Sequence, residues 1–267
     1  MSKLLKYIMR VLLIFLFLIG SIYLYNEWIN SRVEVTYETI EMKDLPDEFE
    51  GFKILHFADL HGVQFGRKQN RLIKLINSLE YDLIAITGDM IDRHNPTLEP
   101  FFDLIDGIRD ERPILFSKGN VDTEEDFMKI RDYGLEVMDE PYIIEKNGER
   151  LVFQKYDFYQ KVDPMYENDV VIGLGHEPFP QDLGYKLILV GHYHAGQFRI
   201  PGYGAIYVPR VEGSGWATDQ SEIVGVQQFD GYSQHITAGL GASADIKWMQ
   251  KRWFNPPQIN ILQLTKK

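Results

Sequence analysis

Five short apolar runs in the sequence each stop abruptly at a group of carboxylates, amides or histidines. The runs occupy residues 53–58, 82–87, 114–116, 170–174 and 186–190. Amphipathic segments with helical spacing separate the first three runs, so strands and helices alternate as in an α/β fold. Because ligands of open α/β sheets bind at the carboxyl ends of the strands, we expect the polar groups that follow the runs to meet in one crevice.

The last run leads through Gly191 into His192-Tyr193-His194. Side chains alternate in direction along extended backbone, so we expect His192 and His194 to point the same way and Tyr193 to point away. An isolated pair of this kind is as often structural as metal-binding, but this pair belongs to a larger set. The expected metal ligands are Asp59, His61, Asp89, Asn120, His176, His192 and His194.

This set offers oxygen and imidazole ligands, and the chain has no cysteine to supply a thiolate. Mixed ligands of this type suit Mn²⁺, Fe or Zn²⁺ better than Ca²⁺ or Mg²⁺, which prefer oxygen alone. Seven ligands are too many for one tetrahedral ion, whereas two ions about 3.5 to 4 Å apart with a shared carboxylate would use them all. Asp89 is our candidate for the bridging carboxylate.

The same residues stand in motifs that resemble, in order, the signature blocks of the calcineurin-like metallophosphoesterases. The blocks read Asp59-x-His61, Gly88-Asp89-x-x-Asp92-Arg93, Gly119-Asn120-x-Asp122, Gly175-His176 and Gly191-His192-x-His194. The resemblance spans roughly residues 51–264, and segments 191–197 and 255–259 look like the bacterial membrane-anchored branch. That branch is similar to UDP-2,3-diacylglucosamine pyrophosphatase and related phosphodiesterases, although the likeness does not identify a substrate.

The resemblance implies an α/β fold, a four-layer α/β/β/α sandwich of two mixed β-sheets flanked by helices. It also implies two metal sites bridged by Asp89. One ion would be held by Asp59, His61 and His194, and the other by Asn120, His176 and His192. In the reaction that the resemblance implies, the two metals share a hydroxide that attacks phosphorus in line with the leaving group.

One block departs from the family pattern, because Val121 stands where a histidine usually follows the asparagine and assists the leaving group. Valine donates no proton, and general acid catalysis is typically worth about 10² to 10⁴ in rate. We therefore predict a preference for leaving groups of low pKa, with His94 as a candidate substitute. Our candidate catalytic residues are Asp89, Asn120 and His94.

The sequence thus predicts a two-metal hydrolase of phosphoester bonds, a phosphodiesterase or pyrophosphatase acting on a cell-envelope or lipid-linked substrate. The alternative is a protein of the same fold that binds a phosphorylated envelope ligand with little or no turnover. Val121 is the only support for that alternative, because all seven expected ligands are present. A protein phosphatase is a weaker third interpretation, since no peptide groove is evident.

Residues 1–29 are interpreted as a transmembrane signal anchor. An uncharged run at 11–25 follows Lys3, Lys6 and Arg10, and aromatic residues suited to the membrane interface occur at its far end. Positive residues before the run predict a cytoplasmic amino terminus and a catalytic domain outside the cytoplasm. A cleaved signal peptide is the alternative, but no Ala-x-Ala site is available, because the first alanine is Ala58.

We assign residues 30–50 to a linker and edge strand and residues 51–267 to the metallophosphoesterase domain. Amphipathic helices are expected at 67–80, 97–109 and 123–133, and a hairpin with an Asn-Gly turn at 143–152 should begin a second sheet. His56 lies inside a strand and should be structural, whereas His235 is expected at the surface. Arg93 is expected to pair with Asp92 or Asp122 rather than to contact the substrate.

The formal net charge is −11, and the first 32 residues are net positive, so the rest of the chain is more acidic still. Such a domain lacks the positive field that nucleic acid binding needs, and we expect no nucleic acid partner. The expected partners are a phosphoester substrate and the membrane. An aromatic segment with basic residues at 247–254 is either an apolar lip for a lipid-like substrate or ordinary core packing.

Overall fold

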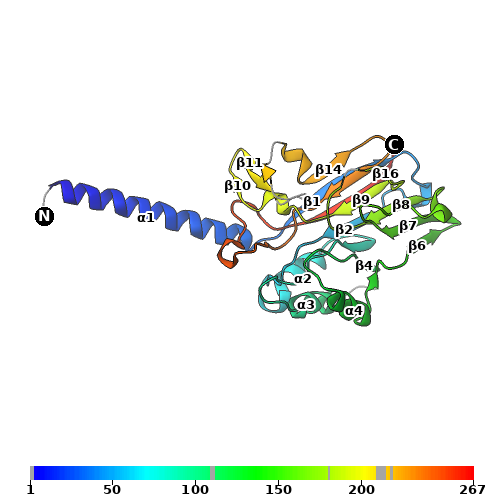
Figure 1. Cartoon of the computed structure of the whole chain (residues 1–267), viewed down its shortest axis with the longest axis horizontal. Coiled ribbons are helices and arrows are strands. Elements are labelled where there is room, and N and C mark those ends of the chain that lie inside the picture. The colour runs from blue at the N-terminus through cyan, green and yellow to red at the C-terminus, as the bar shows by residue number, and fades with distance from the viewer. Residues whose placement is uncertain (1–2, 109–111, 180, 209–214, 217–218) are drawn as a thin grey trace.

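The structure, a computed structural model, describes residues 3–108, 112–179, 181–208, 215–216 and 219–267. Within them, a long N-terminal helix leads into an α/β domain built on two mixed sheets flanked by helices (Figure 1). The first sheet has the order β1-β16-β2-β3-β4-β5, and all neighbours are parallel except β16 and β2. Its strands are β1 (Glu34–Met42), β16 (Gln258–Lys266), β2 (Lys53–Phe57), β3 (Leu83–Ile86), β4 (Ile114–Phe116) and β5 (Glu136–Val137).

The second sheet has the order β14-β15-β9-β8-β7-β6, with antiparallel pairs at its two edges and parallel pairs between them. Its strands are β14 (Gly225–Gln228), β15 (Ser233–Ile236), β9 (Leu187–Val190), β8 (Val170–Leu174), β7 (Glu149–Lys155) and β6 (Tyr142–Lys146). The hairpin β6–β7 turns at Asn147 and Gly148, which have φ of 51° and 87°. Positive φ at both turn residues is what a two-residue Asn-Gly hairpin requires, so the expected hairpin is confirmed.

The main core lies between the two sheets. Alternate residues of β2 and β3 and of β7, β8 and β9 face one another there, among them Ile54, Leu83, Phe153, Ile172 and Leu189. All five are fully buried. Runs that are apolar on both faces are typical of strands covered on both sides, and a second core therefore lies on the outer face of each sheet.

The outer faces of the two sheets are covered differently. Helices α2 (Asn70–Ile76), α3 (Glu99–Gly107) and α4 (Glu124–Asp132) cover the first sheet (Figure 1). On the second sheet, the core is closed by Tyr156, Leu183, Tyr185 and Tyr232 from connecting segments, and by the 3₁₀ turn η3 (Pro164–Tyr166) nearby. In the described part of the chain, loops and a single turn thus replace the fourth, helical layer that the four-layer expectation required.

Helix α2 is shorter than the segment 67–80 that its periodicity predicts. Lys68 and Gln69 adopt left-handed backbone with φ of 51° and 58°, which separates the turn η2 (Arg67–Gln69) from the helix. Gln69 is fully buried, and its side chain accepts from the Phe65 N–H and donates to the Val63 carbonyl. The buried amide thereby fixes a kink that no hydrophobic pattern reveals. Helix α4 begins as expected, with Thr123 and Asp126 forming a capping box.

Helix α1 (Lys3–Asn30) is, within the described residues, the one helix long and apolar enough to cross a membrane. A signal sequence shares that property. Its side chains are exposed up to Tyr25, and its last turns contact the domain through the fully buried Asn26. Strand β1 follows the helix directly and forms the edge of the first sheet, as expected.

The remaining short elements lie between His194 and the last strand. They are η4 (His194–Gly196), β10 (Arg199–Ile200), β11 (Gly204–Ala205), β12 (Tyr207–Val208), β13 (Gly215–Trp216), η5 (Gln220–Glu222) and η6 (Lys247–Met249), with η1 (Asp47–Phe49) earlier in the chain.

A buried polar cluster crosses the interface between the sheets. His56 on β2 contacts His235 on β15 through their Nδ1 atoms at 2.8 Å, and its Nε2 contacts the Thr87 hydroxyl at 2.8 Å. His235 Nε2 lies 3.3 Å from a Glu38 carboxylate oxygen on β1. His235 is fully buried, so the expectation of a surface position is wrong. The sequence does not mark β15 as a central strand, because Ser233 and Gln234 beside His235 are polar, although both are buried.

The buried His56 predicts a pH dependence of stability. Burial and the neighbouring His235 hold the pKa of His56 well below its usual value, so folding keeps this imidazole neutral. The contribution of His56 to the free energy of unfolding is complete above the unfolded-state pKa of about 6.5. It is lost as the pH falls towards the folded-state pKa, because the unfolded chain then binds an extra proton. His56→Gln, which keeps hydrogen-bonding capacity, should lower the pH slope of the free energy of unfolding between pH 7 and pH 5. The change should approach about 1.4 kcal/mol per pH unit.

Urea unfolding of the detergent-solubilised chain and of His56→Gln, followed by tryptophan fluorescence at several pH values, measures this slope. Equal slopes for the two proteins would show that His56 titrates alike in the folded and unfolded states.

Candidate active site

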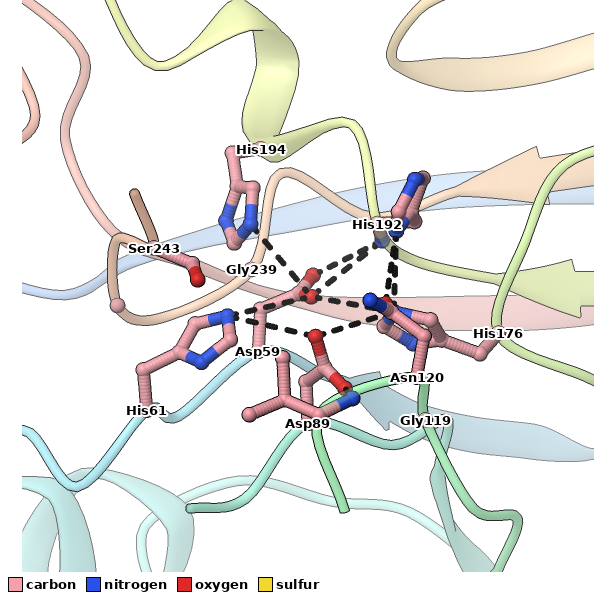
Figure 2. A network of polar contacts seen from close by, with 12 residues as sticks. Asp59, His61, Asp89, Gly119, Asn120, His176, His192, His194, Gly239 and Ser243 are labelled. Atoms are coloured by element: carbon pink, nitrogen blue, oxygen red, sulfur yellow. Dashed lines mark hydrogen bonds and ion pairs between the residues drawn. The ribbon is translucent and has the colours of Figure 1, made fainter. Parts of the chain in front are cut away.

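The polar residues that follow the apolar runs converge at one edge shared by both sheets (Figure 2). Asp59 and His61 follow β2, Asp89 follows β3, and Asn120 follows β4. From the second sheet, His176 follows β8, while His192 and His194 follow β9. Both sheets present the carboxyl ends of their parallel strands here, which is where α/β folds bind ligands.

The two carboxylates lie at the centre of this group. Asp59 Oδ1 is 3.9 Å from the Nε2 atoms of His61, His176 and His194. Asp89 Oδ2 is 3.6 Å from His61 Nε2 and 3.3 Å from His176 Nε2. Asn120 and His192 join from the other side, with Asn120 Oδ1 3.1 Å from His192 Nδ1 and that nitrogen 3.3 Å from His176 Nε2.

These distances suit shared coordination of metal ions. Two groups of ligand atoms lie close enough together to hold an ion: Asp59, His61 and His194 form the first, and Asp59, Asp89 and His176 the second. All of these side chains are buried. Ligands of one tetrahedral ion at about 2.0 to 2.2 Å stand a little over 3 Å apart, close to the spacing seen here and beyond normal hydrogen bonds. His61 Nε2 is buried without a hydrogen-bond partner among the described residues, as a nitrogen reserved for an ion would be.

The two groups are consistent with a dinuclear site. The first matches the three residues expected to hold one ion. Asp59 is the residue common to both groups, whereas Asp89 Oδ2 lies between His61 and His176. The bridging role of Asp89 and the assignment of Asn120 and His192 to the second ion remain predictions.

Backbone carbonyls orient two of the histidines. His176 Nδ1 is 2.7 Å from the Thr87 carbonyl oxygen, and His61 Nδ1 is 3.1 Å from that of Ile91. A carbonyl accepts only from an N–H, so each contact places the ring proton on Nδ1 and leaves Nε2 as the free ligand atom. The Thr87 hydroxyl is also bonded to His56, so the site is continuous with the polar cluster between the sheets.

The loops that carry the ligands have unusual backbone. Positive φ occurs at Asp59 (56°), His61 (46°), Asp89 (60°), His192 (72°) and His194 (50°). Non-glycine residues seldom adopt this region, and clusters of such residues mark functional sites. The His192–His194 pair therefore does not reach the site through the alternation of an extended strand, as we expected. Strand β9 ends at Val190, and left-handed residues turn both imidazoles inward (Figure 2).

A third buried carboxylate, Asp122, supports these loops. Asp122 accepts hydrogen bonds from the backbone N–H groups of Asp89, Met90 and Gly119 at 2.7 to 3.0 Å. It is therefore not a partner for Arg93, which instead lies 3.3 Å from Asp245. The expectation that Arg93 pairs with Asp92 or Asp122 is wrong, because Asp92 accepts from Gln250 and from the loop after it.

Burial governs the ionisation of the histidines. It lowers the pKa of His61 and of His194, and it lowers that of His192 to about 4, with the charge of His176 adding to the effect. These three imidazoles are neutral at neutral pH, which is the form that binds metal. The residues thus have the protonation state that a metal site requires.

The carboxylates respond differently to burial. For Asp59, burial raises the pKa to about 7. For Asp89, burial alone would raise the pKa, but the charge and hydrogen bond of His176 outweigh it and lower the pKa. Without a metal, His176 is the cation that balances Asp89, and its own pKa is raised to about 10 although burial opposes this.

A cavity of about 410 Å³ opens over this group. Besides Asp89, Asn120, His192 and His194, it is lined by Arg93, Gln197, Phe198, Tyr207, Ser243, Ala244, Asp245, Ile246 and Met249. Sequence reasoning missed Ser243, whose hydroxyl is buried without a hydrogen-bond partner among the described residues and points towards His61 and His194 (Figure 2). The available signal was the pair of glycines just before it, Gly239 and Gly241, which allow the backbone to approach the site closely.

Two further residues lie apart from the cavity. His94 is exposed, does not line the cavity, and contacts the Ala244 carbonyl through Nε2 at 2.8 Å. It positions the loop that carries Ala244 and is not aimed at the ligands. Val121 donates its backbone N–H to Asp89 Oδ1 at 2.8 Å, while its side chain packs against the helix-side core.

The two-sheet fold and the buried His/Asp groups at the strand ends define a metal-dependent hydrolase. Residues 52–196 match the calcineurin-like phosphoesterase family, which is more than half of the sequence. The chain belongs to this family.

Relatives with the same domain carry little functional detail. The uncharacterized metallophosphoesterase YkuE of Bacillus subtilis (strain 168) is 26% identical over 269 residues, covering 92% of this chain and 90% of the relative. The uncharacterized metallophosphoesterase YkoQ of the same organism is 26% identical and covers 67% and 74%. A transmembrane protein with metallophosphoesterase domain from Danio rerio is 23% identical, and the match covers 59% of this chain and 44% of that protein.

Close backbone packing at Gly239 provides a test of the site. A Cβ at Gly239 would stand 2.6 Å from Asp59 Oδ2, so Gly239→Ala should displace this carboxylate. We expect metal affinity to fall about 10- to 100-fold, as for other changes that misplace a ligand. Isothermal titration with Mn²⁺ measures the change.

Gly231→Ala is the matched control, because Gly231 has a similar φ of 88° and open space around its would-be Cβ. It imposes comparable backbone strain and should leave metal affinity unchanged. Equal losses in both variants would mean that strain, and not the contact with Asp59, lowers the affinity.

Proposed function

We propose that this protein is a two-metal phosphodiesterase or pyrophosphatase that acts on a lipid-linked or other cell-envelope substrate. The observation that carries the proposal is the convergence of Asp, Asn and His side chains from both sheets beneath one open cavity, with two groups of ligand atoms close enough to hold ions. A pair of divalent ions held there would supply an activated water and a binding site for phosphoryl oxygens. Mn²⁺ is our first candidate for these ions, with Fe and Zn²⁺ as alternatives.

The residues of the chain have separate tasks in this proposal. Asp59, His61 and His194 would hold one ion, Asn120, His176 and His192 would hold the other, and Asp89 would be shared by both. The Asp59 and Asp89 carboxylates supply the negative charge that keeps two cations close together. Arg93 lines the cavity and offers its guanidinium to a non-bridging phosphoryl oxygen.

The cavity favours substrates whose leaving group needs no proton. Among the described lining residues, the only histidines are His192 and His194, and both are assigned to metals. His94 is held by the Ala244 carbonyl outside the cavity, and Val121 offers only a backbone N–H to Asp89. Anhydrides and activated diesters, which release weakly basic groups, are therefore the best substrates of this site.

We assign α1 as a permanent anchor that leaves the catalytic domain outside the cytoplasm. The orientation follows from the basic residues that precede the apolar run. The docking of the helix favours an anchor over a cleaved signal. Asn26 is fully buried, donates to the Arg252 carbonyl and accepts from the Phe254 N–H, and cleavage would leave these groups without a partner.

Turnover tests the proposal directly. The detergent-solubilised full chain with Mn²⁺ should hydrolyse bis(p-nitrophenyl) phosphate, and chelator should abolish the reaction. The full chain is preferable to a fragment starting near Arg32, which would lack Asn26. Asp89→Asn removes a charge that both ions need, and we expect its rate to fall by at least about 10³-fold.

Metal content of both proteins distinguishes the possible failures. A wild-type chain that binds two ions and shows no turnover would contradict the enzyme and favour a binding protein. Undiminished turnover in Asp89→Asn would place the reaction elsewhere.

A series of substrates with different leaving groups tests the leaving-group prediction. For aryl phosphodiesters of increasing leaving-group pKa, we expect the wild-type kcat/KM to decline steeply, because the described residues that line the cavity include no histidine beyond the two assigned to metals. Val121→His should reduce this decline if its imidazole reaches the cavity, and Val121→Leu is the control without a proton donor. Alkyl and aryl diesters hydrolysed at similar rates by the wild-type chain would contradict our account of Val121.

A further inference from the structure

The end of the anchor helix is joined to the wall of the cavity. Asn26 and Asn30 both donate to the Arg252 carbonyl at 2.8 Å, and the Phe254 N–H donates to Asn26 at 2.9 Å. Lys251 lies 3.0 Å from Glu27 and contacts the Tyr23 hydroxyl at 3.2 Å. Residues 251–254 are therefore fixed to the last two turns of α1.

The same segment continues into the cavity and towards β10. Ile246 and Met249 precede it and line the cavity. Trp253 pairs with Phe198 in a parallel bridge and exchanges backbone hydrogen bonds with Gln197 and Arg199 at 3.0 and 2.9 Å. An unbroken set of contacts thus runs from α1 through residues 246–254 to the β10–β11 hairpin.

Large apolar side chains along this path are exposed or half-buried. We call them the apolar rim: Phe198, Ile200, Tyr203, Tyr207, Ile246 and Met249. Ile200, Tyr203, Tyr207 and Ile246 are about half exposed or more, at 48, 63, 51 and 51%. Figure 1 shows β10, β11 and the segment before β16 at the end of the domain from which α1 projects.

Helix α1 sets the position of the apolar rim relative to the membrane surface. The uncharged run ends at Tyr25, and about 20 helical residues span the hydrocarbon core. Tyr23, Tyr25 and Trp28 are exposed aromatic residues of the type that lies at the membrane interface. Because Tyr25 contacts Phe254 at 6.2 Å between ring centroids, residues 251–254 lie at headgroup level.

We infer that the apolar rim rests on the bilayer in which α1 is anchored, and that the substrate is a lipid phosphodiester drawn from that bilayer into the cavity. The inference rests on the proposed function and adds the substrate class and the route of entry. The lipid phosphate would meet the metals, while its glycerol or acyl portion would pass over Ile246 and Met249. An apolar surface beside a polar metal site fits a ligand that carries both characters.

The electrostatics favour a lipid held by apolar contact. The acidic domain gains no attraction from an anionic membrane, so α1 and the apolar rim must supply the binding energy. A protein partner on the apolar rim is the competing occupant. The position of the rim beside the interfacial aromatics of α1 favours the lipid.

Two substrates with the same leaving group distinguish an effect on lipid entry from an effect on the hydrolysis step. One is bis(p-nitrophenyl) phosphate in solution, and the other is a diacylglycerol phospho-p-nitrophenol in phosphatidylcholine vesicles that carry the full chain. The variant Ile200→Asn/Tyr203→Asn changes two rim residues that do not line the cavity. Tyr159→Asn is the matched control, since Tyr159 is 91% exposed and lies outside the apolar rim.

The wild-type chain should hydrolyse both substrates. In the rim variant, we expect vesicle hydrolysis to fall at least about tenfold while solution hydrolysis stays within about twofold, because the two polar side chains lose the favourable burial of apolar surface in the bilayer. Tyr159→Asn should change neither rate. Unchanged solution hydrolysis also shows that the rim variant is folded.

The outcomes are distinguishable. Equal vesicle rates in the wild-type chain and the rim variant would overturn bilayer entry over this surface while leaving the phosphodiesterase intact. Solution turnover without vesicle turnover in the wild-type chain would exclude the lipid substrate class. Loss of both wild-type reactions would overturn the proposed function, and the inference would fall with it.

Discussion

Two buried carboxylates, Asp59 and Asp89, face the same histidines, and much of the structure depends on how their charge is balanced. Burial of an unpaired carboxylate is expensive, so cations must accompany both. Without metal ions, protonated His176 supplies the positive charge beside Asp89, and burial raises the pKa of Asp59 to about 7. Two divalent ions would balance both carboxylates and would allow His176, like the other three histidines, to act as a neutral ligand.

Holding these groups so close together constrains the backbone around them. Five of the seven expected ligands have positive φ, and Gly239 and Gly241 pack where any Cβ would strike Asp59 or the backbone beside it. Arg252 is buried beneath this region and donates to the carbonyls of Ala238 and Gly241. The carbonyl of Arg252 itself accepts from Asn26 and Asn30 of α1. The loop against Asp59 and the anchor helix are thus held by a single residue.

The motifs allowed much of the site to be located from sequence, because ligand residues at strand ends leave a local signature. The strands, the hairpin at Asn147-Gly148 and the capped helix after Thr123 were also predictable, because each leaves a signal in neighbouring residues of the sequence. Other features depend on contacts between distant segments. Gln69 kinks α2 through a buried amide, Ser243 reaches the cavity from a glycine-rich loop, and Arg93 turns to Asp245. None of these three leaves a periodic pattern. The covering of the second sheet by loops is a further case, since apolar loop residues such as Leu183 and Tyr185 do not recur with helical spacing.

The relation between the anchor and the site follows from the same packing. A helix that served only as a tether would need no fixed orientation, and a flexible linker would leave the cavity free to face any direction. Here strand β1 starts only a few residues after α1, and the buried Asn26 fixes the rotation of the helix about its axis. A polar residue buried at such a junction is costly unless its partners are held in register, so its hydrogen bonds specify one docking geometry. Because that geometry places the apolar rim at the end of the domain from which α1 leaves, a membrane-spanning α1 would determine which substrates approach the site.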